Sequence, residues 1–173
     1  MPTLVLGAAK ADLRLPEGQK GASQKPPDTD LVGLICVIFS ALSSWDWKTI
    51  GDAMCEDIEW NYAASGVNAG EAPLFGTKQG RKATLKHLQR IQKLLDVKEA
   101  KMDWDHVSVY GHRVSCQGFE KALVRATGKT YETDLGYIFF FEENKMSKVY
   151  IYAKDAKGIN EAFTKAASGW SGV

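Results

Sequence analysis

The sequence predicts an α+β domain in which a curved antiparallel sheet wraps around helices and forms a cone with a central hydrophobic pocket. Apolar residues recur at helical spacing in much of the first half of the chain, whereas residues 97–153 alternate as strands do and contain turn signals. The chain has 173 residues, of which 45% are hydrophobic. This length lets one domain bury a core without disulfides or a structural metal.

The domain is expected to span residues 28–168. Residues 1–27 hold several glycines and a Pro26-Pro27 pair without sustained periodicity, which is typical of a flexible leader. We expect this leader to be dispensable for folding, because no periodic apolar set in it requires burial. Residues 169–173 are expected to fray.

Four helices are expected. The first follows a cap at Asp28 or Thr29, and its apolar residues recur at three and four between Leu31 and Leu42. Ser44 is expected to cap the second helix, from Trp45 to about Cys55. The third and fourth helices are expected over residues 81–95 and 155–167.

The strands follow from period-two alternation. Ile58, Trp60 and Tyr62 alternate with polar residues and predict a half-buried strand, which a glycine-rich loop, residues 65–80, follows as a lid or pocket rim. Four more strands are expected in an antiparallel meander, over residues 98–110, 113–126, 130–141 and 146–153, with turns at Gly111-His112, 127–129 and Glu143-Asn144.

Charge and composition exclude several classes of partner. The net charge is +1, and apolar residues at helical spacing interrupt the densest basic stretch, residues 78–93, so no nucleic-acid partner is expected. The longest apolar run is well below the roughly 20 residues that span a bilayer, so no membrane partner is expected. Cys36, Cys55 and Cys116 lie far apart in apolar segments and indicate buried thiols in a reducing, cytoplasmic compartment.

Glu120 is the first candidate for a catalytic group. It falls on the apolar face of the strand 113–126, and a carboxyl group in an apolar pocket is the usual material of general acid–base catalysis. Two structural explanations stay open. A bulge at Gly118 would turn Glu120 toward solvent, or a neighbouring polar group would simply satisfy it.

Two tyrosines are the other catalytic candidates. Tyr62 shares a strand face with Trp60, and Tyr137 shares one with other apolar residues, so each hydroxyl could donate to a substrate oxygen. Packing in the core is the alternative role for both. The apolar residues expected to bind the substrate are Trp60, Leu88, Ile91, Leu135, Phe139 and Ile151.

No metal or cofactor is expected. His87, His106 and His112 lack metal-ligand spacing, and the chain contains no CxxC, HExxH, phosphate-binding glycine loop or GxSxG motif. His87 is expected at a solvated or boundary position on its helix. Large aromatic residues occur on both faces of the two strands that contain residues 139–141 and 150–152, which favours a homodimer formed through the sheet.

The element order and four local strings resemble the nuclear transport factor 2-like superfamily, in its SnoaL-like and limonene-epoxide-hydrolase-like branch. The resemblance covers about residues 30–165. The strings are D-I-E-W-N-Y (57–62), G-R-K-A-T-L-K-H-L (80–88), A-T-G-K-T-Y (126–131) and F-F-E-E-N-K-M (140–146). These strings indicate the fold, and they do not determine a reaction.

The resemblance implies a small-molecule pocket whose polar residues are particular to this chain. At the positions of the epoxide hydrolases' catalytic Arg-x-Asp pair stand Gly118 and Glu120, and Ile151 stands at their second aspartate. At the water-holding positions stand Trp60 and Tyr62. Of these groups only one acid is retained, as Glu120. The resemblance therefore does not imply the epoxide-opening reaction of that branch. In the ketosteroid-isomerase branch, Tyr62 falls near the base and Tyr137 near the oxyanion acid.

Two principal functions remain open. One is a cofactor-free isomerase, cyclase, dehydratase or hydrolase that acts on a hydrophobic small molecule, with Glu120 as acid–base group and Tyr62 and Tyr137 as donors. The other is a non-catalytic binding or dimerisation module of the same fold, and a nuclear-transport role is a third. The burial of Glu120, and its distance from the two tyrosines, separates the first two.

Overall fold

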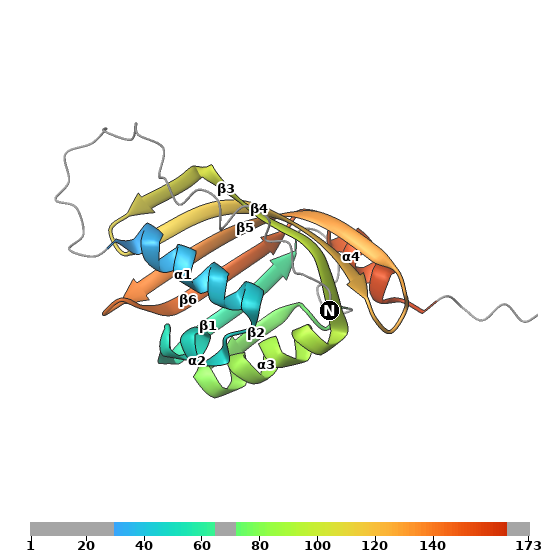
Figure 1. The fold of residues 1–173 in the computed structure, drawn as a ribbon, viewed down its shortest axis with the longest axis horizontal. Helices are drawn as coiled ribbons and strands as arrows, with labels where there is room; N and C mark the ends of the chain where they lie inside the picture. Colours follow the sequence, from blue (N-terminus) through green and yellow to red (C-terminus); the bar gives the residue numbers. More distant parts are fainter. Residues whose placement is uncertain (1–29, 65–71, 166–173) are drawn as a thin grey trace, which may run out of the picture.

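The computed structural model describes residues 30–64 and 72–165, which form one six-stranded sheet and four helices (Figure 1). The helices are α1 (Leu31–Ser44), α2 (Trp47–Asp52), α3 (Arg81–Leu94) and α4 (Ala156–Phe163). The strands are β1 (Met54–Ala64), β2 (Gly76–Gln79), β3 (Leu95–Tyr110), β4 (Arg113–Val124), β5 (Thr130–Glu142) and β6 (Lys145–Ala153). The expected leader, the tail that is expected to fray and part of the expected rim loop lie outside the described residues.

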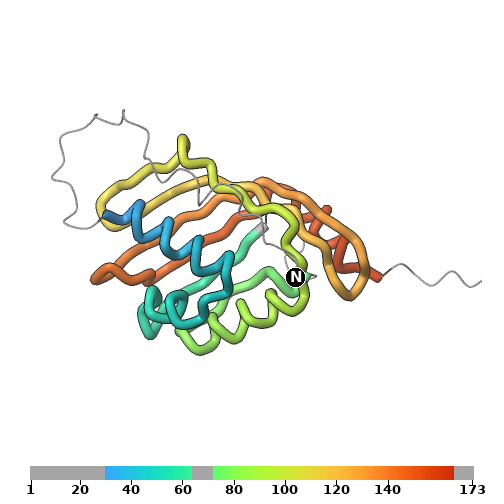
Figure 2. The backbone as a smooth tube through the Cα atoms, in the orientation of Figure 1, coloured from blue at the N-terminus to red at the C-terminus, as the bar shows by residue number. Residues whose placement is uncertain are grey.

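The predicted α+β class is confirmed, and the sheet order is β2-β1-β6-β5-β4-β3. The four predicted strands of the meander are β3 to β6, and each pairs antiparallel with the next. The sheet as a whole is mixed, because β1 pairs in parallel with β6. Figure 2 shows the long strands bending at the end of the sheet that lies near α3 and α4.

One hydrophobic core lies between the sheet and the helices. Every second residue of β4 and β5 is buried over long stretches, including Val114, Cys116, Leu135 and Phe139. Residues of α1 pack against this inner face of the sheet, where Phe39 meets the ring of Phe139 at 5.9 Å between centroids. The predicted pocket between the curved sheet and the helices would therefore lie on this inner face.

The Glu143-Asn144 turn was predicted, and its geometry explains its sequence. Both residues have positive φ, 46° and 63°, which is the backbone of a two-residue hairpin turn. Asparagine tolerates this region better than most residues, and the turn brings β6 back beside β5. This hairpin sets which face of β6 joins the core.

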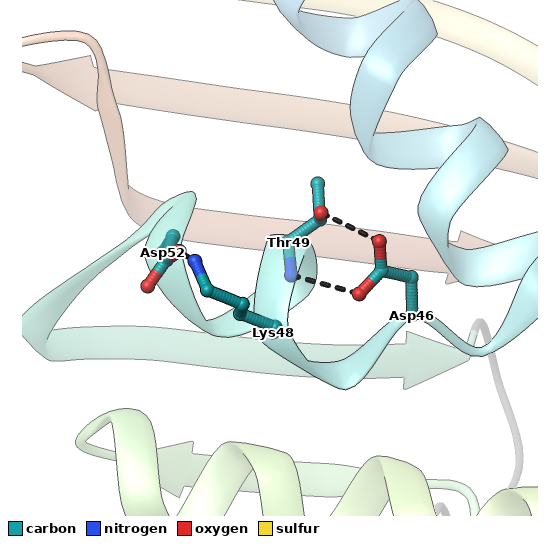
Figure 3. A network of polar contacts seen from close by, with 4 residues as sticks. All are labelled: Asp46, Lys48, Thr49 and Asp52. Carbon is teal, nitrogen blue, oxygen red and sulfur yellow. Dashed lines mark hydrogen bonds and ion pairs between the residues drawn. The ribbon is translucent and has the colours of Figure 1, made fainter.

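The helix caps differ from those expected. Asp30, rather than Asp28 or Thr29, caps α1 through Gly33 N at 2.9 Å. The Ser44 hydroxyl donates to the Ser40 carbonyl at 3.0 Å and belongs to the last turn of α1. Asp46 caps α2, accepting from Thr49 N at 3.1 Å and from Thr49 Oγ1 at 2.6 Å (Figure 3). Asp46 caps α2 in place of the predicted Ser44, because its carboxylate accepts from both the backbone N–H and the hydroxyl group of Thr49.

Three further elements, α2, β1 and β2, differ from the expectation. The second helix ends at Asp52, because the chain turns there into β1, which starts at Met54 rather than near Ile58. Strand β2 lies inside the expected loop 65–80 and pairs with β1 from Tyr62 to Glu59. Its four residues, GTKQ, carry no apolar alternation from which the sequence could predict it.

We expect Asp46→Ala to lower the melting temperature more than Asp52→Ala does. Asp46 caps α2, whereas Asp52 makes an exposed ion pair with Lys48 at 2.6 Å, and such pairs contribute little (Figure 3). The Thr49 hydrogen bonds lower the pKa of Asp46 below 3.8. The effect of Asp46→Ala should therefore be full at neutral pH and fade as the pH falls through that lowered pKa. Thermal unfolding followed by circular dichroism measures both variants, and equal losses would contradict the capping role.

Within residues 30–64 and 72–165, no helix combines the length and apolar character that crossing a membrane requires. The three cysteines are free thiols. Cys116 is buried as expected, while Cys36 and Cys55 are only half-buried. Burial raises the pKa of Cys116 to about 12, which keeps it a protonated, unreactive core thiol.

Candidate active site

Glu120 lies on the inner face of β4, among buried apolar residues. The pairing of β4 with β5 runs without a shift from Arg113 to Leu123, so no bulge at Gly118 interrupts that ladder or turns Glu120 outward. Ala122 and Val124, which share its face, are fully buried. Of the two structural explanations left open, the bulge is wrong, and a polar neighbour does contact the carboxylate.

That neighbour is Tyr131, which is not among the candidate residues predicted from the sequence. Its hydroxyl donates to Glu120 Oε1 at 2.6 Å. Tyr131 stands opposite Ala122 in the β4–β5 ladder, one diagonal step from Glu120, and a diagonal pair lies within reach of an aromatic side chain. The signal in the sequence is the spacing of Tyr131, Leu135 and Tyr137 on one face of β5, which places another hydroxyl on the inner face.

Burial raises the pKa of Glu120, and the Tyr131 hydrogen bond lowers it in part. Among the described residues Glu120 forms no ion pair. Its protonation therefore depends on two opposed effects, desolvation and one neutral donor. A carboxyl group with a raised pKa is a candidate for taking up and releasing a proton during a reaction.

The charge of Glu120 acts on the phenol groups of Tyr62 and Tyr137. Burial raises the pKa of both phenols well above 10.0, and the charge of Glu120 raises it further. The hydroxyl of Tyr62 is buried and has no hydrogen-bond partner among the described residues. The structure thus places on one face the three residues predicted as catalytic: a carboxyl group and two phenols held protonated, which keeps them hydrogen-bond donors.

The position of Tyr137 depends on Gly118. A Cβ atom at Gly118 would lie 3.2 Å from the Tyr137 ring and 2.7 Å from the carbonyl oxygen of Lys101. On its other side, the Tyr137 ring meets Phe39 of α1 edge-on, with centroids 5.3 Å apart. Glycine at residue 118 therefore makes room for the Tyr137 ring.

The residues expected to bind substrate divide into two groups. Trp60, Leu135, Phe139 and Ile151 are buried in the sheet, and Ile151 stands between Tyr62 and Tyr137 in the ladder. Leu88 is buried on α3, where Ile91 is only partly buried. Trp60 Nε1 is buried without a hydrogen-bond partner among the described residues. The binding role of all six stays a prediction.

The expectation for His87 is wrong, because its side chain is 6% exposed rather than solvated. It lies one turn from Thr84 on the face of α3 that packs on the sheet, and both are buried. Burial lowers the pKa of His87, and the charges of Lys78 and Arg90 act in the same direction. The buried face of α3 therefore contains two polar residues, Thr84 and His87, beside the apolar Leu88.

Two cavities lie on the opposite, outer face of the sheet. They have volumes of about 600 and 330 Å³, and Gln117, Gly136 and Tyr152 line both. Glu120 lines neither of them. The predicted central hydrophobic pocket beside Glu120 thus stays a prediction. Within the described residues, no group of three His, Cys, Asp or Glu side chains could hold a metal ion.

No protein-family model and no curated protein matches the chain, whereas many solved structures do. An NTF2-like protein from Burkholderia xenovorans LB400 is 26% identical, covers 78% of this chain and 95% of its own, and has a TM-score of 0.66. An LEH-like epoxide hydrolase of M. tuberculosis is 16% identical, with 76% and 90% covered and a TM-score of 0.57. A provisionally named SnoaL-like polyketide cyclase from Mesorhizobium loti is 16% identical, with 72% and 99% covered and a TM-score of 0.56.

These likenesses cover most of this chain and nearly all of each solved structure. They agree with the mixed sheet and the helices on its inner face. The resemblance inferred from the four sequence strings is confirmed: the chain has the nuclear transport factor 2-like fold.

Proposed function

We propose that the chain is a cofactor-free enzyme that moves a proton on a hydrophobic small molecule, as an isomerase, cyclase, dehydratase or hydrolase does. The observation that carries the proposal is the Glu120 carboxylate, held by the Tyr131 hydroxyl at 2.6 Å on the apolar inner face. Structural neighbours named polyketide cyclase and epoxide hydrolase support a small-molecule reaction in this fold.

Each polar group has a role in this proposal. Glu120 accepts a proton from the substrate and later returns it. Tyr62 and Tyr137 donate hydrogen bonds to the substrate oxygen on which negative charge develops, a task that suits phenols kept protonated by burial and by Glu120. Tyr131 is a positioning residue, because it fixes the orientation of the carboxylate and stabilises its charged form.

Tyr131→Phe is expected to raise the pKa of Glu120 further. The variant removes the one hydrogen bond that favours the carboxylate, while desolvation, which favours the neutral acid, stays. The carboxyl carbon shift of Glu120, followed by NMR against pH, measures this directly and needs no substrate. The matched control is Tyr150→Phe, which removes a 3.0 Å hydrogen bond to Glu59 instead. If Glu120 titrates at its ordinary value of 4.5 in the native protein, the proposed acid–base group is lost.

The two outer cavities favour a second candidate function, a non-catalytic module that associates through the sheet. Ile138 and Tyr152 are 37% and 47% exposed on that face, and large exposed apolar residues around a hollow are typical of interfaces. The free thiols support the accompanying proposal of a reducing, cytoplasmic location.

We expect the native chain to be a homodimer in light scattering at micromolar concentration, and Tyr152→Asp to make it a monomer. A charge at the shared rim of both cavities would be buried unpaired in such an interface. Tyr110→Asp is the matched control, since Tyr110 is 68% exposed and lines neither cavity. A monomeric native mass would contradict the dimer, and so would a Tyr152→Asp variant that remains dimeric.

A further inference from the structure

Positive charge is concentrated on α3 and on the strand before it. Six of the 22 Lys and Arg residues of the chain fall between Lys78 and Lys93, and none of its 21 Asp and Glu residues does. The whole chain has a net charge of only +1, so the remainder of the chain is net negative. The basic residues of α3 therefore form a local excess of charge on an otherwise acidic protein.

Helical spacing gathers these charges into one stripe. Thr84, His87 and Leu88 are buried where α3 packs on β1 and β2, at the lower edge of the fold in Figure 1. Four basic residues on the opposite side of the helix are exposed, and we call them the basic face of α3: Lys82, Lys86, Arg90 and Lys93. Their spacings of four, four and three residues place successive cations about 4.5–6 Å apart along the helix axis.

The cations of the basic face have no carboxylate partner among the described residues. Eight ion pairs occur in residues 30–64 and 72–165, and the basic face belongs to none of them. The carboxylates at the two ends of α3 are already engaged, since Glu56 pairs with Arg81 at 2.8 Å and Asp96 pairs with Lys98. Like charges four residues apart destabilise a helix. An anionic partner bound to this face would relieve that repulsion.

The surroundings of the basic face select among anionic partners. No exposed residue of α3 is aromatic, so a nucleic-acid base has no ring on which to stack, and none is large and apolar, so none can enter a membrane. The net-negative remainder of the chain repels a long polyanion or an anionic membrane that extends beyond α3. A short acidic segment of a protein avoids this repulsion, because it meets only the basic face.

We propose that the basic face of α3 docks a short, extended acidic segment of a partner protein, with a carboxylate at every second residue. Alternate side chains of an extended peptide point to one side at intervals of about 7 Å, which is close to the spacing of the cations. Recognition of acidic motifs by clusters of basic side chains is a recurring mode of peptide binding. The basic face points away from the sheet, so this interaction goes beyond the reaction proposed at Glu120 and does not depend on it.

Fluorescence anisotropy of labelled peptides with the full chain tests the proposal. The probe is the peptide ETETETE, in which β-branched threonines favour the extended form, and the neutral peptide QTQTQTQ is its control. At low salt the acidic peptide should bind at least about tenfold more tightly than the neutral one. Added salt should reduce this difference, because the cations are exposed to solvent.

A triple variant identifies the surface. Lys82→Gln, Lys86→Gln and Arg90→Gln together should weaken binding of the acidic peptide at least about tenfold. The melting temperature should stay the same or rise, because glutamine is a good helix former and the repulsion is removed. The matched control removes the same net charge elsewhere on the surface and should bind like the native chain. It replaces with glutamine three exposed lysines that form no ion pair within the described part of the chain: Lys145, Lys148 and Lys165.

Each other outcome would overturn the proposal. Equal affinity for the two peptides, no binding of the acidic peptide at millimolar concentration, or an equal loss in the two triple variants would each do so. Tighter binding of labelled oligothymidylate would assign the basic face to nucleic acid. Tighter binding of vesicles of phosphatidylcholine and phosphatidylserine would assign it to a membrane surface. The proposed function fails on a different result, the titration of Glu120 at its ordinary pKa.

Discussion

Glu120→Gln is expected to lower turnover by roughly two to four orders of magnitude while making the protein more stable at neutral pH. Glutamine keeps the shape of the side chain and can still accept the Tyr131 hydrogen bond. It cannot take up or release a proton. Loss of activity together with a gain in stability is the pattern of a group kept for chemistry rather than for folding.

The stability gain has a definite pH dependence. Because burial raises the pKa of Glu120 in the folded protein above 4.5, the folded state binds its proton more tightly than the unfolded state. The contribution of Glu120 is therefore fully present below the unfolded pKa and is lost as the pH rises through the folded pKa. The two proteins should melt alike near pH 4, and Glu120→Gln should melt higher at pH 8. Calorimetric scans at the two pH values measure the difference.

Measuring the loss of activity requires a substrate screen and one comparison variant. Hydrophobic enones and hydroxyketones represent the reactions proposed, and turnover is followed by chromatography with mass detection, which also separates isomers of equal mass. Tyr62→Phe should cost less than Glu120→Gln, since it removes one donor and keeps the ring that packs on Phe75. If Glu120→Gln turns over a substrate at the native rate, Glu120 is structural and the non-catalytic function is favoured.

The inward position of Glu120 could be predicted because a strand has a period of two. Val114, Cys116, Ala122 and Val124 are apolar at every second position, and the structure buries all four. The alternation of β5 likewise places Tyr131 on one face of its strand, but whether Tyr131 reaches Glu120 depends on the register between β4 and β5. Register is a property of two strands, and the chain between Val124 and Thr130 shows only that a turn occurs there.

The parallel pairing of β1 with β6 could not be predicted from the sequence, for a related reason. Strands β1 and β6 are more than 80 residues apart along the chain, and nothing local links Trp60 to its partner Val149. The meander was accessible because each of its strands pairs with the next one. Burial of His87 was missed because a helix that packs on the sheet through Thr84 and Leu88 buries the residue between them as well.

Phe139→Ala is expected to destabilise the fold by about 3–5 kcal/mol, the usual cost of deleting a large buried ring. Phe139 is 1% exposed and lies opposite Val114 and Val149 in the centre of the sheet. Its ring contacts Phe39, Tyr137 and Phe141, with centroids 5.9, 5.9 and 6.5 Å apart. The loss combines apolar transfer, an unfilled cavity and broken aromatic contacts.

Urea unfolding measures this loss, and Phe140→Ala is the matched control. Phe140 is the next residue of β5, points to the outer face and is only half-buried, so its removal should cost clearly less. Because Phe39 joins α1 to both Phe139 and Tyr137, the Phe139 variant should also loosen Tyr137. Glu120 should then titrate closer to 4.5 as water reaches it. Equal losses in the two variants would show that the inner face is not the core on which the Glu120 site depends.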